Sequence, residues 1–163
     1  PICEENAIDA LYAAATGFPW RENSSRMVIV ATVDTFLERP DNYGDRDGDG
    51  LTDKLDYPRE GDYPALRTMG ETVAALKDHK IRVFSFTRLA EPGFFDLEKC
   101  GTGRRLPWSA VPDGWSKPYG GAPPIPAATD GENYDLIAVR DGNLSLIETI
   151  NEAVLDNYCK PVL

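Results

Sequence analysis

The chain has 163 residues, a formal net charge of −10 and 42% hydrophobic residues, which suits one domain with a buried core. The negative charge argues against nucleic acid and anionic membranes as partners, because both attract lysine and arginine. No apolar run approaches the roughly 20 residues that span a bilayer, so we expect neither a signal peptide nor membrane insertion.

The first expected elements are a helix and a strand. Residues 5–16 should form a helix that Gly17 ends, because apolar residues recur at helical spacing: Ile8, Leu11, Tyr12 and Ala15. The run from Met27 to Val33 is apolar and rich in β-branched residues. Such a run predicts a strand covered on both faces, as in a parallel sheet.

An insertion at about residues 39–61 contains the sequence pattern that points most specifically to a function. Carboxylates occupy positions 1, 3, 5, 9 and 12 of a twelve-residue stretch, and Gly50 occupies position 6. This spacing wraps one hard cation in oxygen ligands, and Ca²⁺ is favoured because Mg²⁺ demands stricter octahedral geometry. The expected ligands are five side chains and, at position 7, a backbone carbonyl: Asp45, Asp47, Asp49, Leu51 (carbonyl), Asp53 and Asp56. The alternative is a solvated acidic loop, in which unneutralised carboxylates would repel one another.

This loop differs from an EF-hand. Asp56 is one methylene shorter than the usual glutamate at position 12, and proline-containing turns flank the loop where a hand has helices. The stretch instead resembles the free-standing Asp-rich calcium loops of extracellular repeat proteins and dockerins. Extracellular millimolar calcium would fill such a loop, whereas cytosolic calcium would barely do so. We therefore expect an extracellular or cell-surface protein.

A second helix and strand follow the insertion. Asp62 is expected to cap the helix, with Pro64 near its first position. Its apolar face should contain Leu66, Met69, Val73 and Leu76. Residues 81–87, which include two phenylalanines and two β-branched aliphatics, predict the second strand.

The last third of the chain begins with an irregular stretch. Residues 91–133 are dense in proline and glycine, and Trp108 and Trp115 stand isolated within them, either as an exposed docking patch or as part of a core. Residues 134–139 predict a third strand. Asn143 is expected to cap a final helix whose apolar residues are Ile147, Ile150, Val154 and Tyr158. This order of elements indicates a single α/β domain with helices on the faces of its sheet.

The order and the local sequences of these segments resemble those of a von Willebrand factor A domain, specifically the I-like domain of integrin β subunits. The resemblance covers most of the chain outside the insertion and the irregular stretch. It is carried by the segments 5–11, 26–34, 62–66, 81–87 and 142–144. It implies a Rossmann-like three-layer sandwich of the von Willebrand factor A type, with a mostly parallel sheet. It also implies a module, not an enzyme, that recognises a protein ligand through a metal-ion-dependent adhesion site.

The same resemblance assigns two further ligands. Glu5 matches the family's metal-facing glutamate before the helix, and Asp34 matches the aspartate that ends the strand. Glu5 could instead favour the helix N-terminus through the dipole, and Asp34 could form a turn. The family's Asp-x-Ser-x-Ser motif does not occur in this chain, so the fold is expected to lack that strand. Mg²⁺ would bind here only if the motif were supplied from elsewhere.

Two functions of different classes remain open. One is an extracellular recognition module that binds a protein ligand. The other is a calcium-stapled scaffold that holds neighbouring domains and has no ligand-binding metal. Because the chain opens at Pro1 rather than at a methionine, we expect it to be an excised or processed piece. Its three cysteines, Cys3, Cys100 and Cys159, leave one unpaired within the chain, and the pairing is open, with Cys100–Cys159 as our guess.

Overall fold

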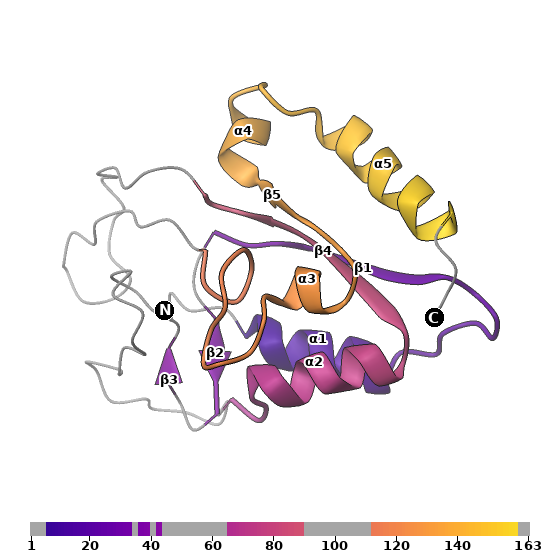
Figure 1. Cartoon of the computed structure of the whole chain (residues 1–163), viewed down its shortest axis with the longest axis vertical. Helices are drawn as coiled ribbons and strands as arrows, with labels where there is room; N and C mark the ends of the chain where they lie inside the picture. The colour runs from indigo at the N-terminus through magenta and orange to yellow at the C-terminus, as the bar shows by residue number, and fades with distance from the viewer. Residues whose placement is uncertain (1–5, 34–35, 40–41, 44–64, 90–111, 160–163) are drawn as a thin grey trace.

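Three parallel strands form the sheet at the centre of the fold (Figure 1). The structure, a computed structural model, describes residues 6–33, 36–39, 42–43, 65–89 and 112–159. The strands are β1 (Arg26–Ala31), β4 (Ile81–Thr87) and β5 (Asn133–Asp135), in the order β1-β4-β5. A separate antiparallel pair is made by β2 (Leu37–Glu38) and β3 (Asn42–Tyr43). The expected α/β class, with parallel strands, is therefore confirmed.

Helices cover both faces of this sheet. Figure 1 shows α1 (Ala7–Thr16), α2 (Met69–Asp78) and the short α3 (Ile125–Ala128) on one face, and α4 (Leu136–Arg140) and α5 (Leu146–Cys159) on the other. Parallel strands need such crossover connections, because a tight hairpin can only join antiparallel strands.

The main core lies between the sheet and the helices α1, α2 and α3. Successive side chains of β4 alternate between the two faces of the sheet. Ile81 and Val83 join the main core, whereas the Phe86 ring lies 5.1 Å from the Tyr134 ring of β5. Apolar residues of α1, α2, α3 and the segments that precede β2 and α3 complete this core: Ile8, Leu11, Ala15, Phe36, Met69, Val73, Leu76, Trp115, Tyr119 and Ile125.

The first strand is less covered than the sequence predicts. It pairs with β4 only, so it lies at an edge of the described sheet. Ile29 is 40% exposed, and the prediction that both faces of this strand are covered is wrong for that residue. The unbroken apolar run correctly predicts a parallel strand, but it does not predict whether that strand lies in the middle or at the edge of the sheet.

The second helix begins later than the sequence predicts. Thr68 is its N-cap, and the Thr68 hydroxyl accepts a hydrogen bond from the Glu71 N–H at 3.1 Å. The Glu71 carboxylate in turn accepts a hydrogen bond from the Thr68 N–H, and the two bonds together form a capping box. Leu66 precedes the helix and is exposed, whereas Met69, Val73 and Leu76 are buried as predicted. Asp62 and Pro64 lie outside the described residues.

The expected third strand is mostly a helix. β5 ends at Asp135, whose carboxylate accepts a hydrogen bond from the Ile137 N–H at 2.9 Å and so caps α4. Asp135 is a good N-cap residue, and its signal for a helix start outweighs the apolar run that predicted a strand over residues 134–139.

The final helix also differs from its prediction. Its N-cap is Ser145 and not Asn143, because the Ser145 hydroxyl accepts from the Glu148 N–H at 3.3 Å. The buried face consists of Thr149, Ala153 and Asn157, while two residues of the predicted apolar face, Ile147 and Tyr158, are more than 70% exposed.

The described part of the irregular stretch, residues 112–133, is folded. It contains α3 and two tight turns. Trp115 is 1% exposed and lies in the main core, its ring edge-on to Phe36 at 6.3 Å. Of the two roles open for Trp115, the structure therefore selects core packing. Trp108 lies outside the described residues.

Candidate functional site at the C-terminal edge of the sheet

The carboxyl ends of the three parallel strands face one side of the molecule. Figure 1 shows that α1 and α2 begin on this same side. In open α/β sheets, ligands bind outside the carboxyl ends of the strands. The helix N-termini add N–H groups and a partial positive charge. A ligand site of this fold is therefore expected at this edge.

The predicted metal ligands all lie outside the described residues. This holds for the calcium loop, Asp45–Asp56, and for Glu5 and Asp34. Their described neighbours do share one edge: Asn6 is the N-cap position of α1, and Val33 follows the end of β1. Within the described ranges, no group of three or more His, Cys, Asp or Glu side chains is arranged to hold a metal. The structure consequently leaves both metal sites as predictions.

Side chains at the ends of β4 and β5 form a closed hydrogen-bond network. The Asn133 Oδ1 accepts from the Ser85 hydroxyl at 2.6 Å and from the Thr87 hydroxyl at 3.0 Å. One oxygen of Asp135 accepts from the backbone N–H of Leu89 at 3.3 Å as well as capping α4. These groups satisfy one another within the protein, so they fix the two strand ends rather than offer ligands.

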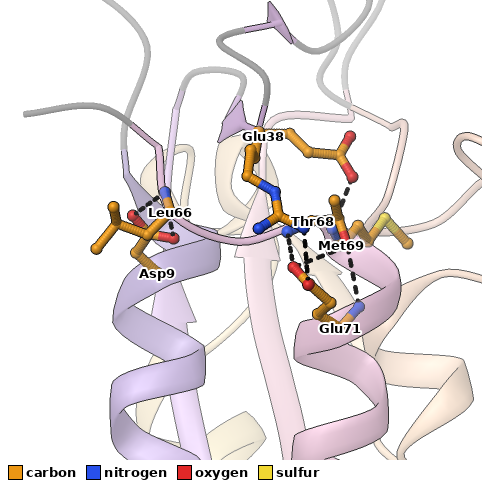
Figure 2. Close-up of polar contacts among 7 residues, drawn as sticks. Asp9, Glu38, Leu66, Thr68, Met69 and Glu71 are labelled. Carbon is orange, nitrogen blue, oxygen red and sulfur yellow. Dashed lines mark hydrogen bonds and ion pairs between the residues drawn. The ribbon is translucent and has the colours of Figure 1, made fainter.

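Three carboxylates hold the chain where it returns to the fold before α2 (Figure 2). Asp9 of α1 accepts from the Leu66 N–H with both oxygens, at 2.9 and 3.2 Å. Glu38 of β2 accepts from the Met69 N–H at 2.7 Å. Glu71 accepts from the Thr68 N–H at 2.8 Å. Three separate elements thus anchor the segment from Leu66 to Met69.

Two of these carboxylates have shifted pKa values. Partial burial raises the pKa of Glu38; the hydrogen bond from Met69 opposes that shift, and repulsion from Glu71 adds to it. The hydrogen bond from Thr68 lowers the pKa of Glu71 against some desolvation, and the guanidinium of Arg39, 2.9 Å from Glu71, lowers it further. Both carboxylates accept backbone hydrogen bonds at the start of α2, but only the ionised form of Glu71 is favoured by its surroundings.

A tyrosine beyond this cluster stays protonated. Burial, followed by repulsion from Glu132, raises the pKa of Tyr134 to about 12. The Tyr134 hydroxyl lies 3.4 Å from the Glu132 carboxylate, to which it donates. It therefore remains a hydrogen-bond donor at neutral pH.

The described part of this edge is suited to anchoring chain segments. Asp9, Glu38 and Glu71 were not predicted from the sequence. Thr68 and Glu71 do show the Thr-x-x-Glu spacing of a capping box before an apolar run, and this signal could have located the start of α2. Asp9 and Glu38 carry no comparable local signal, because their partners are 57 and 31 residues away.

Comparisons with known proteins assign no family. No family model, no curated protein and no solved structure matches the chain. Within the described residues, no helix is long and apolar enough to cross a membrane. The resemblance to integrin β I-like domains therefore remains a prediction from the sequence.

Proposed function

We propose that the chain is an extracellular protein-recognition module similar to an integrin β I-like domain, of the von Willebrand factor A type. The observation that carries the proposal is the loop from Asp45 to Asp56, with five carboxylates at calcium-binding spacing. In this proposal, Ca²⁺ orders the loop, and the ordered rim of the sheet presents the surface that contacts a protein ligand.

The described ends of the insertion support a stapling role for calcium. The described residues on the two sides of the calcium loop are those of β3 and Ala65, which is 4% exposed. The next residue, Leu66, is held by Asp9. A loop whose returning end is already fixed loses less conformational entropy when an ion orders it. The anchored segment in Figure 2 thus favours calcium binding.

A second cation at the rim is a further part of the proposal. Glu5 and Asp34 would contribute two oxygens, and a divalent cation takes about six ligands. When bound, Mg²⁺ would offer an open coordination position to a carboxylate of the protein ligand. Asn6 and Val33, the described neighbours of these two residues, lie at the C-terminal edge, where such an ion would be needed.

One observation favours the scaffold alternative. The three carboxylates that surround the returning chain, Asp9, Glu38 and Glu71, all accept backbone hydrogen bonds. These hydrogen bonds give each of the three carboxylates an anchoring role within the fold that needs no metal. In this alternative, the calcium loop stabilises a domain that holds its neighbours and binds no ligand through a metal.

Metal-dependent binding distinguishes the two functions. The full chain would be tested against immobilised extracellular-matrix proteins in buffers with Ca²⁺ and Mg²⁺, with Ca²⁺ alone and with EDTA. Recognition predicts binding that requires Mg²⁺ and is lost in Asp34→Ala. The matched control is Asp78→Ala, an exposed aspartate at the C-terminal end of α2, which should bind as the unmodified chain does.

The opposite outcome is equally clear. A chain that is stabilised by Ca²⁺ but shows no Mg²⁺-dependent binding to any of these surfaces would exclude the recognition proposal as tested and support the scaffold. Loss of binding in both Asp34→Ala and Asp78→Ala would point to general charge effects and contradict the assignment of Asp34.

A further inference from the structure

A small hollow lies at the opposite edge of the sheet, where the strands begin. Its volume is about 210 Å³. Arg26 is the first residue of β1, Arg82 is the second residue of β4, and Lys77 and Lys80 flank the end of α2. All four side chains line the hollow. On the right-hand side of Figure 1, the ends of α2 and α5 approach the beginnings of β1 and β4.

The charge of this hollow is opposite to that of the chain. The whole sequence carries a net charge of −10, yet the lining has four cations and a single carboxylate, Asp130. Four like charges repel one another, and this repulsion is relieved when an anion binds between them. A cationic hollow on an acidic protein would also draw an anion to one place and not to the general surface.

The two arginines are positioned by helix ends. The Arg26 guanidinium donates to the carbonyl of His79, the C-cap of α2, at 2.9 Å. The Arg82 guanidinium donates to the carbonyls of Asp156 and Asn157 in the last turn of α5, at 3.3 and 3.5 Å. Each guanidinium has five N–H donors. These contacts fix the guanidinium groups and leave further donors for a ligand.

The lysines have a different environment. Lys77 and Lys80 are exposed, and within the described part of the chain neither ammonium group forms an ion pair. One simple role is to complement the negative end of the α2 dipole. That role predicts a contribution to stability but no saturable anion binding, so the two roles can be separated by experiment.

The remaining wall is rigid. Thr129 is 5% exposed, and its hydroxyl accepts from the Val83 N–H at 3.1 Å and donates to the Ile125 carbonyl at 2.8 Å. The following residue, Asp130, has φ +57°. Thr129 and the two arginines are therefore held in place by the fold, which lowers the entropy cost of ordering them on binding.

We propose that this hollow binds a tetrahedral oxyanion, carried as a sulfate or phosphate monoester. Guanidinium groups match such oxygens in a bidentate fork, and lysines add point charges. The volume is below the roughly 300 Å³ at which pockets for larger organic ligands begin, so it suits the anionic group itself. This site lies at the other edge of the sheet from the proposed recognition rim and does not depend on it.

The test is a titration of the full ¹⁵N-labelled chain with inorganic sulfate, followed by NMR at constant ionic strength. Sulfate is preferred to phosphate because calcium phosphate is much less soluble than calcium sulfate. Amide shifts should saturate around residues 77–82 and 128–130. Lys77→Gln/Lys80→Gln should weaken binding about tenfold, since two screened charge interactions are lost. Lys117→Gln removes an exposed lysine outside the hollow and should change affinity less than about twofold.

A second variant tests the same proposal in the other direction. Asp130→Asn removes the opposing carboxylate, and asparagine tolerates a positive φ as well as aspartate does, so binding should tighten a few-fold. Titrations with N-acetylglucosamine 6-sulfate and with O-phosphoserine then show whether the group comes from a sulfated glycan or a phosphorylated protein. Shifts that rise linearly without saturation, or an equal loss in Lys117→Gln, would overturn the proposal.

Discussion

Glu38 and Glu71 meet at the start of α2, yet their surroundings shift their pKa values in opposite directions. Glu38 has a raised pKa, chiefly because it is partly buried. Glu71 has a lowered pKa, chiefly because it accepts from the Thr68 N–H. Ionised Glu38 therefore lowers the stability of the fold; this penalty appears as pH rises from about 4.5 through its raised pKa. Ionised Glu71 raises stability, and its contribution is lost as pH falls through its lowered pKa.

The first prediction follows from this difference. Glu38→Gln keeps an oxygen that can accept from the Met69 N–H and removes the partly buried charge. At pH 7 the variant should melt about 1–2 °C higher than the unmodified chain. At pH 4, where Glu38 is mostly protonated in both folded and unfolded states, the difference should shrink. Thermal unfolding followed by circular dichroism at the two pH values measures this.

Glu71→Gln is the matched comparison. It changes the neighbouring carboxylate in the same way but removes a charge that the fold stabilises, so its melting temperature at pH 7 should fall. If both variants shift the melting temperature in the same direction at pH 7, the opposite pKa shifts of the two residues are wrong.

At the scale of elements, one glycine controls how the chain enters β5. A Cβ atom on Gly131 would overlap the Val83 carbonyl oxygen of β4. Because the clashing atom is backbone, the strand itself would have to move. Gly131→Ala should therefore destabilise the fold by at least about 2 kcal/mol and lower its melting temperature by about 4–8 °C. Chemical denaturation of the purified variant measures this free energy.

Gly17 is the control for this substitution. A Cβ atom there would lie 3.2 Å from the Ala13 carbonyl oxygen at the exposed end of α1, so a small shift of the helix end would accommodate it. Gly17→Ala should change stability much less. If the two variants lose similar stability, the close approach of Gly131 to β4 does not control the fold.

The predictability of each element depended on how local its causes are. The β4 strand was predicted with its observed bounds, because an apolar, aromatic run between helix and loop signals leaves little choice. The buried face of α5 was not, because Thr149 and Asn157 are buried, whereas polar side chains are mostly exposed. The capping-box spacing of Thr68 and Glu71 indicates the observed start of α2. The apolar Leu66, at helical spacing from the residues that follow, instead suggested that the helix begins earlier. Asp9 and Glu38 accept hydrogen bonds from residues 57 and 31 positions away in the chain, and no local pattern reports such partners.

At the scale of the whole molecule, the negative charge is unevenly distributed. The stretch from Asp45 to Asp56 contains five aspartates together with Arg46 and Lys54, and so contributes −3 of the formal net charge of −10. Cations gather instead at the edge where the strands begin, around Arg26 and Arg82. Under the proposed functions, the two edges would bind ligands of opposite sign: a cation at the acidic loop and an oxyanion at the hollow. Binding at either edge would then also reduce local repulsion within the chain.

The last prediction concerns calcium and the stability of the chain. An ion that binds only the folded state stabilises it by mass action, by about 2.7 kcal/mol at a calcium concentration one hundred times its Kd. The melting temperature should then rise by about 5–10 °C. Asp47→Ala/Asp49→Ala removes two of the expected ligands and should abolish that rise, whereas Asp78→Asn at the exposed end of α2 should retain it. Magnesium at the same concentration should have a smaller effect, because it keeps more of its own water. A double variant that still responds fully to calcium would show that the ion binds elsewhere, and the recognition and scaffold functions would both lose the loop on which they depend.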